Sequence, residues 1–318
     1  MTSVLVTGAA GFLGRWFVRH HLAQGDFVLG VDDLSNPHSA WPDELDGLRR
    51  YQMDAASWFR QGINATPEDE IGLSKWDLVY HFAAPVGGRE KIEGDPLFNA
   101  NSLALDSLFF RWAVKRAGIA IYPSSSAVYG TVFQEDTPRL LTEDFFHPDG
   151  PAWHVPDEMY GLTKLVGEFL AWKSARYGLN TLCIRPFSGY GEGQSLEYPI
   201  PSILARAKAK ENPLVIWGTG EQRRDFIHVS DVVGATIARL NEGVRGYQSL
   251  NIASGKPTSF LEVARLAADI VGYRPEVQRD TTKPSGVSTR YGSVALMSRY
   301  YTPKVSLRDG LTRVLEGL

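Results

Sequence analysis

The chain has 318 residues, of which 43% are hydrophobic and 22% charged, and its formal net charge is −3 at pH 7. This composition is typical of a globular protein with one main core and a smaller appended lobe. It has no basic excess that would suggest a nucleic-acid partner. No apolar stretch approaches the ~20 residues of a membrane span, so we expect no membrane partner.

The single cysteine, Cys183, lies in an apolar run and is expected to be a packed, inert thiol. One cysteine excludes an intrachain disulfide and fits a reducing cytoplasm. Because the N-terminus enters a strand-like run at once, we expect no signal peptide and a cytoplasmic location. The seven histidines show no spacing typical of metal ligands, so we expect no bound metal.

The first predicted strand, over residues 3–7, leads into a glycine-rich turn and then a helix predicted over residues 12–23. Gly8 permits a tight turn, Gly11 lets the backbone approach a phosphate, and Gly14 lets the helix pack closely on the strand. The free N–H groups at the start of such a helix favour a pyrophosphate. The spacing G-x-x-G-x-x-G departs from the usual dinucleotide motif, so by itself it is also consistent with an ordinary turn.

A second predicted strand, over residues 27–31, ends in Asp32 and Asp33. A carboxylate at this point can accept hydrogen bonds from the adenosine ribose hydroxyls, and it would repel a 2′-phosphate. The order of strand, glycines, helix, strand and acid therefore predicts dinucleotide binding, with NAD favoured over NADP.

Strand-like and helical runs alternate along the rest of the first half, which predicts an α/β fold with a Rossmann-type doubly wound parallel sheet. Further strands are predicted at residues 49–53, 77–82, 119–123 and 180–186, a polar loop or short helix at 61–75, and long helices at 97–117 and 158–177. We expect residues 1–187 to form the NAD-binding domain.

Beyond residue 187 the pattern changes to Gly- and Pro-rich loops between shorter elements. Helices are predicted at residues 200–210, 229–240 and 259–270, and strands at 214–217 and 248–252. We expect residues 188–318 to form mainly a smaller substrate-binding lobe over the carboxyl ends of the strands, where ligands of such sheets bind. Segments near 228–255 are expected to return to the first domain.

Tyr160 and Lys164 are four residues apart on a predicted helix, so their side chains share one face. A nearby ammonium and the positive charge of oxidised nicotinamide would lower the tyrosine pKa from its usual value near ~10. Tyr160 could then accept a proton from a sugar hydroxyl while Ser125 holds the oxygen. Such pairs are also common on helix surfaces, but residues 124–130 follow a predicted strand and so reach the carboxyl edge of the sheet.

Together these motifs resemble those of extended short-chain dehydrogenases/reductases, in the group of NAD-dependent nucleotide-sugar epimerases and dehydratases. The resemblance covers nearly the whole chain and rests on residues 7–14, 32–35, 54, 81–84, 124–130, 160–164, 185–187, 223–227 and 251–255. It implies that the chain binds NAD and a nucleotide-diphosphate sugar.

The resemblance also implies a homodimer formed by the two long helices, since these carry more apolar side chains than one sheet face needs. The side chains concerned are Leu105, Phe109, Phe110, Trp112, Val166, Phe169, Leu170 and Trp172.

The resemblance further implies a cofactor site. Asp54 resembles the residue that holds the adenine amino group, Lys164 the lysine that bonds the nicotinamide ribose, and Pro186 lies where the backbone meets the carboxamide. The expected cofactor-binding residues are Gly8, Gly11, Phe12, Leu13, Gly14, Asp32, Asp33, Leu34, Ser35, Asp54, Ala55, Phe82, Ala83, Ala84, Asn101, Ser124, Tyr160, Lys164, Pro186 and Ser188.

For the substrate, Arg224 resembles the family's diphosphate clamp, with Arg290 as a second clamp. Trp217 falls where an aromatic ring stacks on the base, although a core tryptophan under a loop is the alternative. The expected substrate-binding residues are Val86, Gly87, Gly88, Ser125, Ser126, Tyr160, Ser188, Tyr198, Trp217, Arg224 and Arg290, and the expected catalytic residues are Ser125, Tyr160 and Lys164.

Departures from the family narrow the reaction. Ser126 and Ala127 replace the Asp-Glu pair of 4,6-dehydratases, and Ala127 also replaces the cysteine of 3,5-epimerising relatives, so both reactions are disfavoured. A 4-epimerase-like reaction through a transient keto-sugar remains. The run Val86-Gly87-Gly88 resembles a turn of GDP-fucose synthase and GDP-mannose 3,5-epimerase, which slightly favours a GDP-sugar over a UDP-sugar.

Three alternatives stay open. One is another NAD-dependent isomerisation of a GDP-sugar, such as 3,5-epimerisation or a pyranose–furanose change, with Tyr198 or Glu197 as an added proton carrier. Another is a keto-sugar reductase, which would consume external NAD(P)H. The third is a non-enzymatic NAD-sensing module, against which the Tyr160–Lys164 pair argues.

Overall fold

The main feature of the fold is a parallel sheet. The computed structural model describes residues 1–41, 47–61, 74–85, 87–148, 150 and 154–318. In this part of the chain, seven parallel strands pair in the order β10-β6-β5-β4-β1-β2-β3. This arrangement confirms the predicted α/β fold with a doubly wound sheet. The loop predicted over residues 61–75 falls almost entirely outside the described residues.

The strands follow the predicted runs to within a few residues, because central strands covered on both faces read as continuous apolar stretches, whereas the edge strand β3 is polar and largely exposed. They are β1 (Ser3–Thr7), β2 (Phe27–Asp32), β3 (Leu48–Gln52), β4 (Trp76–His81), β5 (Ala117–Pro123), β6 (Asn180–Pro186) and β10 (Tyr247–Ile252). The strand order reverses at β1, which lies between β2 and β4. The carboxyl ends of these central strands therefore border the crevice in which such sheets bind ligands.

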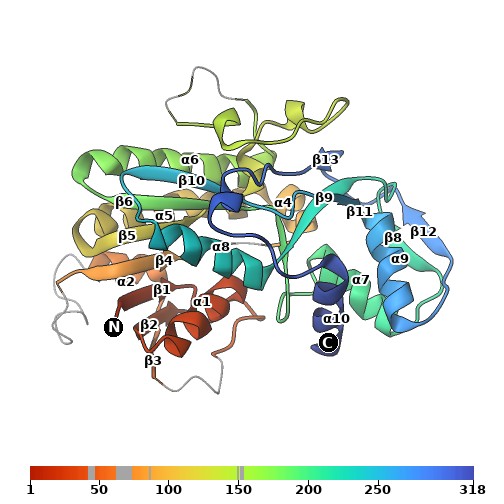
Figure 1. The fold of residues 1–318 in the computed structure, drawn as a ribbon, viewed down its shortest axis with the longest axis horizontal. Helices are drawn as coiled ribbons and strands as arrows, with labels where there is room; N and C mark the ends of the chain where they lie inside the picture. The colour runs from red at the N-terminus through yellow and green to blue at the C-terminus, as the bar shows by residue number, and fades with distance from the viewer. Residues whose placement is uncertain (42–46, 62–73, 86, 149, 151–153) are drawn as a thin grey trace.

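Helices cover both faces of the sheet (Figure 1). α1 (Phe12–Ala23) and α8 (Val229–Asn241) contact each other on one face, while α2 (Ala55–Gln61), α5 (Pro96–Arg116) and α6 (Glu158–Ser174) form a layer on the other. The alternation of side chains along β1 produces these two layers, because Val4 and Val6 pack with α1 and Leu5 packs with α5. None of the helices in the described ranges is both long and apolar enough to cross a bilayer.

The C-terminal lobe lies to one side of the sheet (Figure 1). In it, α7 (Pro199–Lys208), α9 (Phe260–Val271) and α10 (Leu307–Glu316) pack with the parallel strands β8 (Leu214–Trp217) and β12 (Val277–Asp280). A second small sheet joins the lobe to the main sheet and consists of β7 (Ser188–Tyr190), β9 (Arg223–His228), β11 (Pro257–Ser259) and β13 (Thr289–Arg290). Between β9 and β11, the chain returns to the first domain as α8 and β10.

The apolar side chains of α5 do not form the surface on which the dimer prediction relied. Phe109, Phe110 and Trp112 are only 0–3% exposed and belong to the core between α5 and the sheet. The apolar residues named on α6, including Val166 and Trp172, are half-buried. The aromatic residues of α5 thus stabilise the monomer, while Leu105 on α5 and the named residues of α6 are partly exposed.

A buried ion pair ties α6 to the sheet. Arg185 on β6 is fully buried, and its Nε and Nη2 donate to Glu168 Oε1 and Oε2 at 2.8 and 2.7 Å. Ser124, which follows β5, and Tyr247 on β10 also donate to Glu168. Glu168 therefore connects α6 to the ends of three neighbouring strands.

We predict that Glu168→Gln lowers the free energy of unfolding by about 3–5 kcal/mol, because the buried Arg185 guanidinium loses its counter-charge. Urea unfolding measures this change. The matched control is Glu221→Gln, which breaks an ion pair with Arg279 in which the side chains of Arg279 and Glu221 are 50% and 57% exposed. That control should cost about 1 kcal/mol or less. Equal losses in the two variants would contradict the structural role assigned to Glu168.

Candidate active site

A cavity of about 1370 Å³ lies between the carboxyl ends of the sheet and the C-terminal lobe. Most residues predicted for the cofactor and the substrate line it. They are Gly8, Gly11, Phe12, Leu13, Gly14, Asp32, Asp33, Ser35, Ala55, Phe82, Ala83, Ala84, Gly87, Gly88, Asn101, Ser124, Ser125, Ser126, Tyr160, Lys164, Pro186, Ser188, Tyr198, Trp217, Arg224 and Arg290. The residues predicted for the cofactor and those predicted for the substrate therefore line one common cavity.

Three predicted residues are not placed on this wall. Asp54 accepts a hydrogen bond from the Ser57 N–H at 3.0 Å and so caps the start of α2. Leu34 does not line the cavity, and its N–H donates to Asp32 Oδ1 at 2.9 Å. Val86 lies outside the described residues.

The glycine turn brings bare backbone to the cavity wall. Gly8 has a φ of +67°, and a Cβ there would lie 2.6 Å from the backbone N of Ala83. A Cβ at Gly14 would lie 2.0 Å from the carbonyl oxygen of Gly8. Only glycine permits this contact, which sets the start of α1 directly against the turn. The exposed backbone and the helix start fit a dinucleotide pyrophosphate.

Asp32 lines the cavity beside the glycine turn. Its Oδ2 accepts the Ala10 N–H at 3.0 Å and its Oδ1 accepts the Leu34 N–H at 2.9 Å. Burial raises the pKa of this carboxyl, and the two backbone N–H groups partly offset the rise. Asp32 thus joins the glycine turn to the loop after β2 while still lining the cavity.

The predicted catalytic residues come together where α6 packs against the turn after β5. Ser125 caps the short 3-10 helix η1 (Ser126–Val128), and its Oγ accepts the Ala127 N–H at 3.1 Å. A Cβ at Gly161 would lie 2.4 Å from the Ala127 carbonyl oxygen, so α6 touches this turn directly. Because Ser125 Oγ already accepts a bond, its own hydrogen is available to a sugar oxygen.

Lys164 lies beneath Tyr160 on the same face of α6. Its Nζ is 5.9 Å from the centre of the Tyr160 ring and 5.3 Å from that of Tyr122. Lys164 is only 4% exposed. Ser126 and Ala127, also buried, place no acid or base beside the pair.

Two aromatic residues of the lobe complete the wall. Tyr198 precedes α7, and burial, followed by the influence of Tyr160, raises the pKa of its phenol. The phenol of Tyr198 therefore stays protonated at neutral pH. Trp217 is half-buried at the end of β8, and the Nζ of Lys283 lies 5.2 Å from its ring centre.

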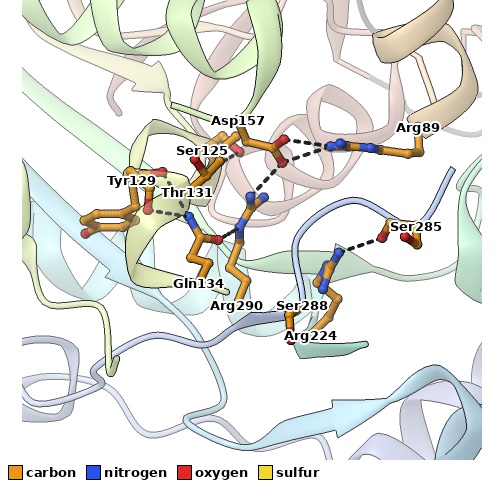
Figure 2. A network of polar contacts seen from close by, with 12 residues as sticks. Arg89, Ser125, Tyr129, Thr131, Gln134, Asp157, Arg224, Ser285, Ser288 and Arg290 are labelled. Atoms are coloured by element: carbon orange, nitrogen blue, oxygen red, sulfur yellow. Dashed lines mark hydrogen bonds and ion pairs between the residues drawn. The ribbon is translucent and has the colours of Figure 1, made fainter. Parts of the chain in front are cut away.

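The predicted clamps Arg224 and Arg290 lie near a third arginine, Arg89, at the start of α4 (Arg89–Gly94), as Figure 2 shows. Asp157 accepts bonds from Arg290 Nη2 at 2.6 Å and from Arg89 Nη1 at 2.9 Å. Burial alone would raise the pKa of Asp157, but Arg290 and Arg89 outweigh it and hold the pKa below its usual value. Burial, followed by repulsion from Arg290, lowers the pKa of Arg224 to about 9.

Arg89 and Asp157 were not predicted as site residues, although both line the cavity. The available signals were local: Arg89 directly follows the Gly87-Gly88 turn, and Asp157 is an acid just before the predicted helix that carries Tyr160. Neither signal indicates that the two side chains meet, because they are far apart in the sequence.

Comparisons with known proteins agree with this geometry. The chain is 30% identical to a dTDP-4-dehydro-6-deoxy-D-allose reductase from a Streptomyces species, with 97% of this chain and 94% of the relative covered. A UDP-glucose 4-epimerase from Mycolicibacterium smegmatis is 29% identical, with 98% and 97% covered. The solved structure of MoeE5 with UDP-glucuronic acid and NAD is 30% identical, covers 99% of this chain and 98% of that chain, and superposes with a TM-score of 0.80.

The names of these relatives give different reactions and nucleotides, and the solved structure shares the fold described above. Residues 4–253 match the NAD dependent epimerase/dehydratase family, a range that includes the glycine turn, the Ser125 turn and α6. The predicted resemblance to nucleotide-sugar epimerases and dehydratases is thus confirmed, and the chain belongs to the NAD-dependent epimerase/dehydratase family.

Proposed function

We propose that this enzyme is an NAD-dependent epimerase that inverts one hydroxyl-bearing carbon of a nucleoside-diphosphate sugar, in the manner of a 4-epimerase. The observation that carries the proposal is the convergence of Ser125, Tyr160 and Lys164 in one cavity, with no acid or base at Ser126 and Ala127. Such a set can move one hydroxyl proton and lacks the second proton carrier that dehydration or 3,5-epimerisation requires.

NAD would be held by the glycine turn, Asp32 and Lys164, and it supplies reversible hydride transfer at a carbinol carbon. The phenol of Tyr160 accepts the proton of the same hydroxyl, and the buried Lys164 ammonium stabilises the phenolate. Ser125 donates its hydrogen to the sugar oxygen as charge develops there. Return of the proton from Tyr160 restores the hydroxyl group.

The nucleotide is held in this proposal by Trp217, which stacks on the base, and by Arg224 and Arg290, which bind the diphosphate. The earlier preference for GDP rested on the turn that contains Gly87 and Gly88. A Cβ at Gly88 would lie 2.3 Å from the Glu197 carbonyl oxygen, so close backbone packing requires a glycine at this position. This requirement is independent of which nucleotide base the substrate carries. UDP-sugars therefore stand beside GDP-sugars as candidate substrates.

A keto-sugar reductase is the second candidate, favoured by the relative of that activity at 30% identity. The two reactions differ in their balance of reducing equivalents. A reductase consumes added NADH in proportion to its product, whereas an epimerase returns its hydride and turns over with NAD alone.

The decisive experiment incubates the NAD-loaded protein with UDP-, GDP-, dTDP- and ADP-hexoses and identifies products by NMR. We predict an epimer formed without added reductant. Tyr160→Phe should lower this turnover by about two decades or more, because the proton carrier is lost. Tyr177→Phe, at a site 74% exposed at the end of the same helical segment, is the control and should retain full activity. Wild-type turnover by Tyr160→Phe would exclude the assigned role.

For the cofactor, we predict that NAD binds about tenfold or more tightly than NADP. The reason is that a 2′-phosphate would meet the carboxylate of Asp32, whose oxygens are already held by Ala10 and Leu34. A fluorescence titration with both dinucleotides measures this difference, and Asp32→Ser should narrow it. Tighter binding of NADP to the wild-type protein would refute the selectivity.

We also propose a homodimer through α6, whose outer surface carries Leu162, Val166, Phe169 and Trp172. Pairing of such helices across a two-fold axis would cover these side chains. Light scattering should give twice the chain mass of 35.2 kDa. Val166→Arg should yield the monomer, while Val155→Arg, at a site 78% exposed outside α6, should leave the dimer intact. A wild-type monomer at micromolar concentration would refute the proposal.

A further inference from the structure

Three arginines lie near one another at the edge of the cavity, and two of them bind the same carboxylate (Figure 2). Asp157 binds Arg89 and Arg290, while Arg224 donates to the carbonyl oxygens of Arg223 at 2.8 Å and of Ser285 at 3.1 Å. Arg89 and Arg224 both approach Gly286, where a Cβ would lie 3.0 Å from Arg89 Cζ and 3.2 Å from Arg224 Nη2. The two guanidinium groups therefore lie against the same residue.

The cluster has an excess of positive charge. Asp157 is the buried carboxylate among the three arginines, with a side chain 7% exposed. The Glu93 carboxylate also binds Arg89, but its side chain is 32% exposed and water weakens its effect. Burial first, and then repulsion from Arg290 and Arg89, lower the pKa of Arg224, even though Asp157 and Glu135 act in the opposite direction. A dianion placed here would relieve this repulsion.

We propose that Arg89 is a third diphosphate-binding residue, supplied by the dinucleotide-binding domain, and that Asp157 positions its guanidinium group beside Arg224 and Arg290. The inference rests on the proposed function, since its ligand is the diphosphate of the sugar nucleotide. Arginine suits this role because its planar fork bonds two phosphate oxygens at once. The diphosphate is then held by both lobes, with Arg89 at the start of α4 and the other two arginines on β9 and β13.

Asp157 also connects this anion site to the catalytic residues. Its N–H donates to the Ala127 carbonyl at 3.0 Å, and its own carbonyl accepts the Gly161 N–H at 2.9 Å. Asp157 is therefore fixed both to the turn that carries Ser125 and to the first turn of α6. Asp157 therefore links Arg89, which would bind the diphosphate, to the helix turn that carries Tyr160.

The test is calorimetric titration of UDP and GDP into the NAD-loaded full-length protein. Arg89→Ala should weaken binding of the nucleoside diphosphate about tenfold or more, because charge-assisted bonds are lost. Its affinity should also fall less steeply with added salt than that of the wild type, since fewer charges meet the ligand. Arg89→Lys should recover part of the affinity, because it keeps the charge and lacks the fork.

The matched control is Arg223→Ala. Arg223 is the sequence neighbour of Arg224, its side chain is 40% exposed, and it pairs with Glu262 rather than lining the cavity. This variant should bind both nucleotides as the wild type does. NAD affinity should stay unchanged in all variants, and Arg89→Gln provides a second substitution that preserves side-chain volume.

Each other outcome overturns the inference. If Arg224→Ala loses affinity and Arg89→Ala does not, the diphosphate is bound without Arg89, and the proposed function stands. If both Arg89→Ala and Arg89→Gln lose NAD and nucleotide affinity equally, Arg89 is a structural residue. If the wild-type protein binds neither UDP nor GDP, the inference fails together with the proposed function.

Discussion

The buried ion pair between Glu168 and Arg185 fixes the position of α6, the helix that carries the proposed catalytic residues Tyr160 and Lys164. Tyr160, Lys164 and Glu168 follow one another at intervals of four residues and share one face of α6. The first two line the cavity, while Glu168 is held beneath it by Arg185 and Ser124. An unpaired charge at this depth would cost several kcal/mol, about 3–5 by comparison with other buried pairs. The helix therefore has one favourable rotation and height, which sets Tyr160 beside the turn of Ser125.

Close contacts of the α6 backbone also fix the position of this helix, and glycines permit these contacts. A Cβ at Gly161 would collide with the Ala127 carbonyl oxygen, and one at Gly167 would lie 1.9 Å from the hydroxyl of Tyr122. The same Tyr122 hydroxyl donates to Asp106 on α5 at 2.6 Å. The contacts at Gly161 and Gly167 bring α6 against the sheet on both sides of Lys164, whose Nζ lies over the Tyr122 ring. Close packing and buried hydrogen bonds thus hold the groups around the Lys164 ammonium in fixed positions.

The sequence was sufficient to predict the main sheet, because buried parallel strands give apolar runs and long helices give regular periodicity. It could not predict α4, whose six residues are too few to show a period, or β9, whose Arg223-Arg224-Asp225 is polar. The aromatic residues of α5 on which the dimer prediction partly relied are buried, since α5 packs on the sheet and also on α2 and α6, and the dimer itself stays a prediction. Periodicity does not distinguish a neighbour in the same chain from one in a partner. The ion pair of Arg89 with Asp157 joins residues that no local pattern connects.

The proton carriers available in the cavity limit the chemistry that the site supports. Removal of a carbon-bound proton requires a base beside that carbon, and the raised pKa of Tyr198 keeps this phenol protonated. Glu197 also lines the cavity, but its side chain is exposed to solvent. Tyr160, with Lys164 one turn further along α6, is the phenol that carries the hydroxyl proton in the proposed reaction. Inversion of a single carbinol carbon by reversible hydride transfer to NAD would need one group that accepts and returns the hydroxyl proton, and a phenol can fill this role. Reactions that also move a proton at the neighbouring carbon need a further acid or base.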